Sequence, residues 1–460
     1  MGAYARCKRR SDAVHLCQSV VDLAVIDHAQ GMNNAPPSLE ALVADGRISP
    51  AIYTDEAIYQ AELKNLFGRA WLFIAHESQI SQPGDFVTSF MGEDPIVVTR
   101  QADGSIGAFL NQCRHRGMKL CRLDSGSARR FTCSYHGWVY DTAGKLVGVP
   151  REAAVYGESV DRGEWSAVPV AQLDSYKGLV FATWDAEAPA LGIYLGAVRW
   201  YLDAIIDRVP EGSVVFGGAH RWTIETNWKL PAEQFASDFY HAHTAHRSAM
   251  AALAPPGTPS ELLAFPDEGF QFSSAQGHGT GFAATELPLI EAARRADPAE
   301  VARFAAASER LGDRRGESMG AQHMTVFPNL SLLKDPRALR IWHPRGPNSI
   351  EVWSWTLVDG DLDDERRRHE ARKTMTSFSP AGIFEADDGE NWVEIQGVLR
   401  GAKARETELH VGMGLERDRP ANPGFPGDID AAHSEEAARR FYARWAEMVD
   451  GVAWGEMEFS

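Results

Sequence analysis

The spacing of apolar residues divides the chain near residue 185 into two regions of different character. In the first region, strand-like apolar runs follow one another between turn residues, at 71–73, 86–90, 96–99, 106–110, 131–132, 138–140 and 179–184. Short runs of this kind predict β-strands, and Ala102-Asp103-Gly104 predicts a hairpin turn. This region is therefore predicted to be a small β-rich unit.

Apolar residues at helical spacing are more frequent outside that unit. They predict helices over 54–67, 194–206, 297–311, 363–375 and from 434 onward. The last helix carries one apolar stripe, made of Ala438, Phe441, Tyr442, Trp445, Met448 and Val449. Strands are predicted over 222–224, 339–342 and 350–355. Residues 250–320 show few strand signals and are predicted to cover a pocket.

Composition limits the class of protein. A chain of 460 residues can bury a large core and is expected to hold two domains. The net charge of −17 argues against nucleic acid, because there is no basic patch to neutralise phosphates. No apolar run approaches the ~20 residues that span a bilayer. All five cysteines lie before residue 134, which excludes a disulfide framework for most of the chain and fits the reducing cytoplasm.

Four residues of metal-ligand type form two mixed pairs in the β-rich unit. Cys113 and His115 form a CxH pair, and Cys133 and His136 form a CxxH pair after an intervening loop. Zinc sites usually pair like with like, whereas mixed pairs suit a Rieske cluster, in which one iron binds two thiolates and the other two imidazoles. We therefore expect a [2Fe-2S] cluster here, and a structural zinc ion is the alternative.

A second group of ligand-type residues lies between 233 and 246. Two imidazoles and one carboxylate form the facial triad of non-haem Fe(II) oxygenases, which leaves positions open for O₂ and substrate. On an ideal helix, spacing alone favours His243 with His246. His241 and His246 lie about 140° apart around a straight helix, and they converge only where the helix bends, widens or ends. Both pairs stay open on geometry alone.

The motifs NQCRHRGMKLC…FTCSYHGWVYD, Asp238-x-x-His241-x₄-His246 and FEADDGENWVEIQ resemble the Rieske non-haem iron ring-hydroxylating dioxygenases, large (α) subunit, in the biphenyl/toluene/phenylpropionate branch. The resemblance implies that His241, His246 and Asp388 bind the mononuclear Fe(II), with Asp387 as the fallback carboxylate. It implies that Asp238 bridges electrons between subunits. Pocket positions are matched by Gln234, Phe235, Phe378 and Phe384.

The same resemblance implies an α+β fold with two parts. One is a Rieske β-sandwich-like [2Fe-2S] domain at 70–185. The other is a catalytic domain with a large antiparallel β-sheet covered by helices (helix-grip or START-like), at 186–460. Residues 41–69 are expected to form an N-terminal helix of the catalytic domain. Residues 1–40 are expected to be an N-terminal extension, with a disordered arm as one possible form.

The implied function is that of a terminal oxygenase that adds both atoms of O₂ to an aromatic ring and gives a cis-dihydrodiol. Electrons would come from NADH through a ferredoxin reductase and a ferredoxin. The implied assembly is an α₃ ring, usually with three small β subunits. Alternatives are a Rieske monooxygenase or demethylase, a dioxygenase of an arylcarboxylate, and a non-enzymatic electron carrier or zinc-stapled binding protein. An uncharged aromatic is the favoured substrate.

Overall fold

The computed structural model describes residues 38–157, 159–317 and 319–459. The predicted extension at 1–40 therefore lies almost entirely outside the described residues. None of the helices in the described part combines the length and apolar character that crossing a membrane requires.

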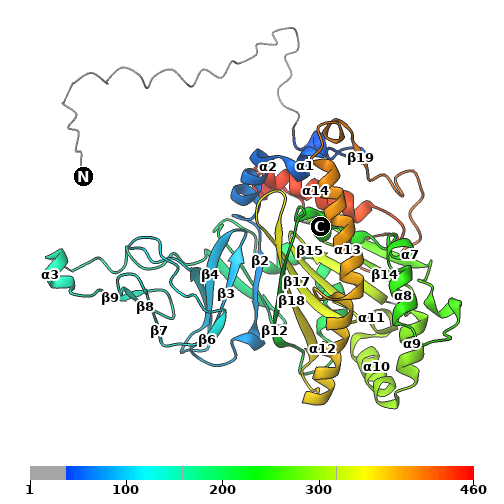
Figure 1. Ribbon diagram of the computed structural model, residues 1–460, viewed down its shortest axis with the longest axis horizontal. Helices are drawn as coiled ribbons and strands as arrows, with labels where there is room; N and C mark the ends of the chain where they lie inside the picture. The colour runs from blue at the N-terminus through cyan, green and yellow to red at the C-terminus, as the bar shows by residue number, and fades with distance from the viewer. Residues whose placement is uncertain (1–37, 158, 318, 460) are drawn as a thin grey trace, which may run out of the picture. The chain divides into compact units, whose positions relative to one another are not determined.

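Small antiparallel sheets form the β-rich unit (Figure 1). One sheet has the order β5-β4-β3-β6, a second has β7-β8-β9, and a third has β10-β11-β2. Their strands are β2 (Leu72–His76), β3 (Asp85–Met91), β4 (Asp94–Arg100), β5 (Ile106–Leu110), β6 (Ser125–Ser127), β7 (Arg130–Thr132), β8 (Val139–Asp141), β9 (Leu146–Gly148), β10 (Gln172–Tyr176) and β11 (Leu179–Thr183). A separate aromatic core of Phe86, Phe109, Phe131 and Tyr140 joins the first two sheets. The predicted Rieske-type sandwich is confirmed.

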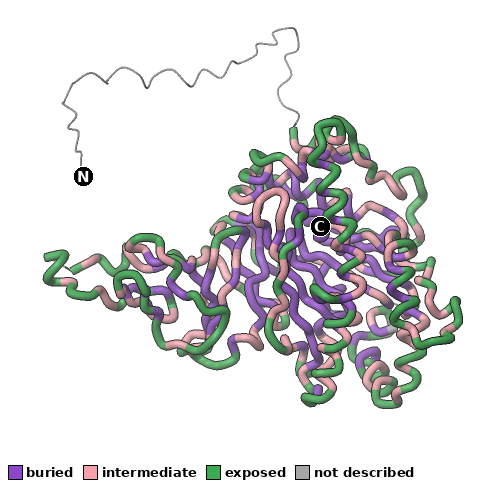
Figure 2. Tube along the Cα trace, viewed as in Figure 1, coloured by how far each residue is buried: buried purple, intermediate pink, exposed green. Residues whose placement is uncertain are grey.

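One eight-stranded sheet organises the rest of the chain. Its order is β12-β18-β17-β16-β15-β14-β13-β20, and every neighbouring pair is antiparallel. The strands are β12 (Ser213–Ile224), β13 (Gly269–Ser273), β14 (Gly279–Ala283), β15 (Gly320–Val326), β16 (Leu330–Lys334), β17 (Arg337–Pro344), β18 (Ile350–Asp359) and β20 (Asp428–Ala431). Burial is concentrated along these strands (Figure 2). The predicted antiparallel sheet covered by helices is confirmed.

Two helices that matter for the site lie on one face of this sheet. Helix α6 (Lys229–Ser237) packs on β14, β15 and β16, and Thr325 donates to the carbonyl of Ala232 in that helix. Arg340 on β17 lies opposite Ser331, on the same face as Thr325, and reaches α13 (Ile383–Leu399). Helix α12 (Asp364–Phe378) packs beside α13. The sheet therefore holds α6 and α13 on one face, and Figure 1 shows α12 and α13 crossing the sheet.

Helices from both ends of the chain meet around a buried ion pair. The N-terminal elements α1 (Ala51–Thr54), α2 (Glu56–Ala61) and the π-helix η2 (Glu62–Leu66) lie against α14 (Glu436–Val449). Glu62 accepts from Lys229 at 2.5 Å and from the indole nitrogens of Trp228 and Trp445, and both charged side chains are fully buried. These contacts fix the start of α6.

Two sequence expectations need correction and one is confirmed. The predicted helix 194–206 is two helices, α4 (Leu191–Leu195) and α5 (Val198–Ile206), because Gly196 has φ of 50° between them. The helix expected after the Thr54-Asp55-Glu56 cap is confirmed, since Asp55 caps α2 and the helix continues through η2 to Leu66. The region 250–320 contains β13 and β14, whose glycines and polar residues hide their strand signal, besides α8 (Arg247–Leu253), α9 (Pro288–Arg295), α10 (Pro298–Leu311) and α11 (Asp313–Glu317).

Candidate metal centres and active site

The two cysteine loops share one backbone geometry. Cys113 N–H donates to the carbonyl of Met118, and Gly117 N–H donates back to the carbonyl of Cys113. The second loop repeats the pattern with Trp138 and Gly137 around Cys133. Gly117 and Gly137 have φ of 74° and 75°, a conformation that glycine adopts without steric cost. Each of the two loops therefore presents one cysteine and one histidine.

The four predicted cluster ligands differ in how deeply they are buried. Cys113 and Cys133 are buried, while His115 is half-buried and His136 is exposed. The two imidazole rings lie 4.4 Å apart between centroids, and His115 stacks on Trp138. Burial raises the pKa of the Cys113 thiol, so a metal must displace its proton. An inner thiolate pair and an outer imidazole pair fit a cluster with one iron on each.

Three ligand atoms converge at the other predicted centre. His241 Nε2 and His246 Nε2 are 3.2 Å apart, and Asp388 Oδ1 lies 3.4 Å from each. Three ligands at about 2.1 Å from one octahedral ion lie roughly 3.0 Å apart, or slightly more when the angles open. The triangle therefore has the size that a facially bound cation requires. His243 is not part of it.

A break in the helix brings His241 and His246 together. Helix α6 ends at Ser237, and Asp238 has ψ of 89°. The chain then re-enters a short helix, α7 (Ala242–Ala245), and α8 begins at Arg247. The two histidines thus flank α7 and do not lie on one straight helix, which removes the 140° separation expected of an ideal one.

Each ligand side chain is oriented by a further polar residue. Asp238 Oδ2 lies 3.3 Å from Nδ1 of His241, and Asp238 Oδ1 accepts from the backbone N–H of His241 at 3.0 Å. Asp387 Oδ2 lies 3.3 Å from Nδ1 of His246. Gln234 donates to Asp388 Oδ1 at 2.9 Å. Asp387, the fallback ligand, therefore contacts the far side of a histidine and not the triangle.

The carboxylates control the charge on the histidines. Burial lowers the pKa of His241, but contacts with Asp238 and Asp388 outweigh burial and raise it to about 10. Burial also opposes ionisation of Asp238, yet the contact with His241 leaves its pKa below the usual range. A cation that binds the triangle must therefore displace a proton from His241.

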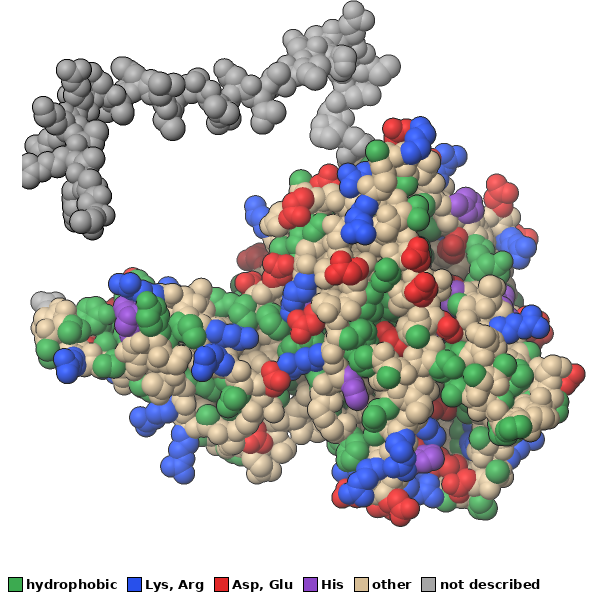
Figure 3. All heavy atoms as spheres, in the orientation of Figure 1, with side chains coloured by type: hydrophobic (Ala, Val, Ile, Leu, Met, Phe, Trp, Pro, Cys, Tyr) green, Lys and Arg blue, Asp and Glu red, His purple; other side chains and the backbone are tan. Residues whose placement is uncertain are grey.

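A cavity of about 490 Å³ opens on the triangle. Near the metal ligands its wall includes Phe235, Phe378 and Phe384, and Phe378 and Phe384 stack with centroids 5.2 Å apart. The far end is charged and includes Arg303, Lys334 and Arg337, which the sequence did not identify as pocket residues. In the view of Figure 3, charged side chains of both signs gather at the lower end of α12 and near α10.

Two structural features of the site had no sequence signal. Arg340 is fully buried and donates to Glu385 and to the carbonyl of Phe378, both at 2.6 Å. Trp392 donates to Gln234 at 2.7 Å. The first contact fixes the start of α13, and the second fixes the amide that touches Asp388. Apolar spacing identifies neither the burial of Arg340 nor the polar partner of Trp392.

Comparisons with known proteins agree with this geometry. A family profile described as the ring hydroxylating alpha subunit (catalytic domain) matches residues 200–451, and one described as the Rieske [2Fe-2S] domain matches residues 70–173. The biphenyl 2,3-dioxygenase α subunit of Rhodococcus jostii (strain RHA1) is 47% identical over 420 residues, covering 90% of this chain and 91% of the relative.

A second relative and a solved structure also match about nine-tenths of this chain. A benzene 1,2-dioxygenase α subunit of Pseudomonas putida is 46% identical over 430 residues, covering 91% of this chain and 95% of the relative. The solved structure of naphthalene 1,2-dioxygenase from Rhodococcus sp. bound to indole has a TM-score of 0.79 at 34% identity, covering 90% of this chain and 96% of that chain.

These matches define a Rieske non-haem iron oxygenase. The chain belongs to the α subunits of aromatic ring-hydroxylating dioxygenases, with a Rieske [2Fe-2S] domain and a catalytic domain that binds mononuclear iron. The dioxygenase prediction is supported over the monooxygenase or demethylase alternative, and the carrier and zinc-stapled hypotheses are wrong.

Proposed function

We propose that His241, His246 and Asp388 hold the mononuclear Fe(II), and that Cys113, His115, Cys133 and His136 hold the cluster. The observation that carries the first assignment is the triangle of ligand atoms with edges of 3.2–3.4 Å. We also propose the domain division 41–69 and 186–460 for the catalytic part and 70–185 for the Rieske part.

Asp238 is the electron bridge of this proposal. Its side chain is 35% exposed, whereas that of Asp388 is 2% exposed, so one carboxylate reaches the surface and the other stays inside. The outer face of Asp238 is free for a Rieske histidine of a neighbouring α subunit, while its inner face holds His241. We therefore propose a head-to-tail α₃ ring, with small β subunits, a ferredoxin and an NADH-dependent ferredoxin reductase as partners in the cytoplasm.

An uncharged aromatic is the proposed substrate class. When bound, the iron supplies the O₂ chemistry that puts both oxygen atoms on the ring and gives a cis-dihydrodiol. Phe235, Phe378 and Phe384 hold the ring edge toward the open face of the triangle and exclude water. The relatives whose names mention biphenyl and benzene support this class.

The charged end of the cavity supports the same choice. Arg294, Arg303 and Lys373 pair with Glu286, Asp361 and Glu370 at 3.4, 2.8 and 3.0 Å, and Arg337 pairs with Asp359. These cationic side chains already have carboxylate partners, so they would gain little from pairing with a substrate carboxylate. Lys334 is different: it donates to the carbonyl of Met319, and no carboxylate among the described side chains pairs with it. It makes an arylcarboxylate the second candidate substrate.

The assembled, iron-loaded enzyme tests both proposals. Asp238→Asn is expected to keep three irons per chain, two in the cluster and one mononuclear, and to lose turnover, while the exposed Asp418→Asn serves as the control. A panel of benzene, biphenyl and benzoate, with product identification, tests the substrate. A phenol or formaldehyde as the product would contradict ring dihydroxylation, and wild-type rates in Asp238→Asn would contradict the bridge.

A further inference from the structure

A second group of possible metal ligands lies beside the iron triangle. His243 on α7, Asp267 ahead of β13 and His433 after β20 each offer one ligand atom, and these atoms all lie within 4.8 Å of one another. The three residues come from segments far apart in the sequence. None of them belongs to the His241, His246 and Asp388 set, so the group needs its own explanation.

The imidazoles of this group are incompletely bonded. Nε2 of His243 and Nδ1 of His433 are buried, and neither has a hydrogen-bond partner within the described residues. The two ring centroids are 5.3 Å apart. A buried polar atom without a partner costs about 1–3 kcal/mol. Two such atoms on adjacent rings, with a carboxylate beside them, point to a ligand that accepts lone pairs from both rings.

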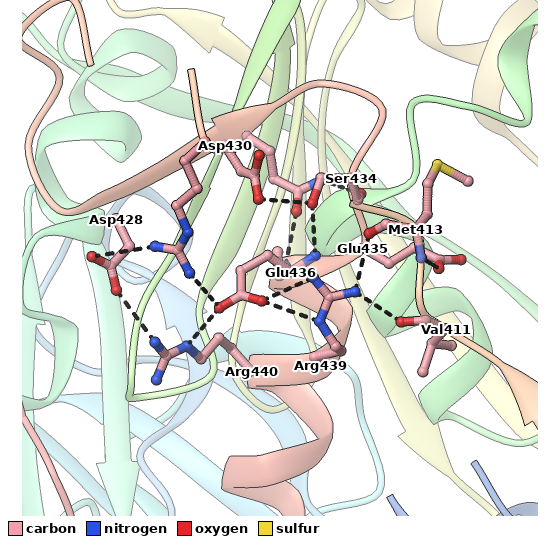
Figure 4. Close-up of polar contacts among 12 residues, drawn as sticks. Val411, Met413, Asp428, Asp430, Ser434, Glu435, Glu436, Arg439 and Arg440 are labelled. Atoms are coloured by element: carbon pink, nitrogen blue, oxygen red, sulfur yellow. Dashed lines mark hydrogen bonds and ion pairs between the residues drawn. The ribbon is translucent and has the colours of Figure 1, made fainter. Parts of the chain in front are cut away.

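The backbone around His433 is held on both sides (Figure 4). Ser434 donates to Asp430 at 3.0 Å and accepts from the N–H of Glu436 at 3.2 Å, while Glu435 accepts from the N–H of Met413 at 2.7 Å. These contacts fix the turn between β20 and α14, which contains His433. One ligand of the group is therefore presented by a rigid segment.

Only a small movement is needed to bring the three ligand atoms to metal-binding distances. Three ligands at about 2.1 Å from a tetrahedral ion lie roughly 3.4 Å from one another. Atoms now separated by up to 4.8 Å must approach by roughly 1.4 Å at most. Asp267 is exposed, so its side chain can rotate to shorten its own distances to the two histidines.

We propose that His243, Asp267 and His433 bind one divalent transition ion of the zinc class, with water as the fourth ligand. Two imidazoles and one carboxylate suit Zn²⁺, whereas Ca²⁺ and Mg²⁺ prefer sets made of oxygen alone. The ring of Phe239, next to Asp238, lies 6.3 Å from both histidine rings. The ion ties α7 to two distant segments and steadies the stretch 239–246, which carries two of the iron ligands.

The experiment uses the assembled enzyme, already loaded with iron, and Zn²⁺ alone as the probe. Calorimetric titration, with metal analysis after desalting, is expected to give one zinc per chain while iron stays at three. His433→Ala and Asp267→Asn are each expected to weaken zinc binding at least tenfold and to leave iron and the visible spectrum of the cluster unchanged. His410→Ala, on an exposed histidine, is the matched control.

Three results decide the proposal. Zinc is expected to raise the thermal midpoint of the wild type and of His410→Ala but not of the two ligand variants. Unchanged zinc affinity in Asp267→Asn and His433→Ala would overturn the site. So would zinc that displaces iron one for one, since it would then occupy the catalytic triangle. Asp267 is on the surface, so its variant keeps the test valid if His433→Ala fails to fold.

Discussion

The indole nitrogen of Trp392 donates a 2.7 Å hydrogen bond to the side-chain oxygen of Gln234. This bond fixes which end of the amide faces the metal ligands, because the amide nitrogen is then left to donate to Asp388 at 2.9 Å. The carboxylate that we assign to iron is thus held in place by a buried residue one helical turn further along α13.

Trp392→Phe keeps the aromatic packing and removes the N–H donor. The loss of one hydrogen bond, about 0.5–1.5 kcal/mol, is expected to lower kcat roughly three- to tenfold. Iron content is expected to stay at the wild-type level, since all three ligands remain. Trp353→Phe is the matched control, because that indole donates to Glu351 on β18. An equal loss in both variants would contradict the role of Gln234.

Asp388 and Asp387 are neighbours with different expected roles. Asp388→Ala is expected to reduce iron from three to two per chain and to leave the EPR signal of the reduced cluster intact. Asp387→Asn removes only the contact behind His246 and is expected to weaken iron binding by about 10–100-fold without abolishing it. Iron analysis after dialysis separates the two, and the reverse order of severity would exchange the assignments.

Arg340 and Glu385 form a fully buried pair that supports α13. Arg340→Met leaves the Glu385 carboxylate buried without its partner and is expected to lower the free energy of unfolding by about 3–5 kcal/mol in urea titrations. Arg340→Met with Glu385→Leu removes both charges and is expected to recover most of that loss. A double variant as unstable as the single one would show that packing, and not the unpaired charge, sets the cost.

Glu233 makes the free energy of unfolding fall as the pH rises, which is the opposite of the usual effect of a carboxylate. Burial, with the nearby charges of Asp238 and Glu435, raises its pKa to about 8. The folded state then holds a proton that the unfolded state releases above its ordinary pKa near 4.5. This contribution is complete below pH 4.5 and declines by at most about 1.4 kcal/mol per pH unit as the pH rises toward 8.

Glu233→Gln removes that titration. Unfolding free energies of the variant and the wild type, measured from pH 5 to pH 8, are expected to diverge steadily, with the variant relatively more stable at the higher pH. Glu436→Gln, which removes a carboxylate that pairs with three arginines at the start of α14, is the comparison variant (Figure 4). Parallel profiles for wild type and Glu233→Gln would show that Glu233 is ionised in the folded state.

Spacing and local pattern in the sequence predict features that depend on residues close together in the chain. The stripe from Ala438 to Val449 is buried as expected, and Cys113 and Cys133 follow the ends of strands β5 and β7 as expected. Only the family resemblance favoured His241 over His243, because the break at Asp238 that brings His241 next to His246 is absent from an ideal helix.

Other features depend on partners distant in the chain. Arg340 reads as a solvated residue within a strand, and only the approach of α13 gives it a partner. The charged end of the cavity was missed for the same reason, because Lys334 and Arg337 face it from a hairpin whose pattern indicates only strands. Strands β13 and β14 escaped prediction because neighbouring strands, and not their own composition, hold them in the sheet.

Helix α13 carries both Asp388, the carboxylate proposed to bind iron, and the cavity-wall residue Phe384, only four residues apart. Replacing Phe384 with a smaller side chain, to admit a bulkier substrate, would therefore also disturb the proposed iron ligand on the same helix. Directed evolution of this enzyme should find wider tolerance at Phe378, at the end of α12, where the size of the accepted substrate and the retention of iron can change separately.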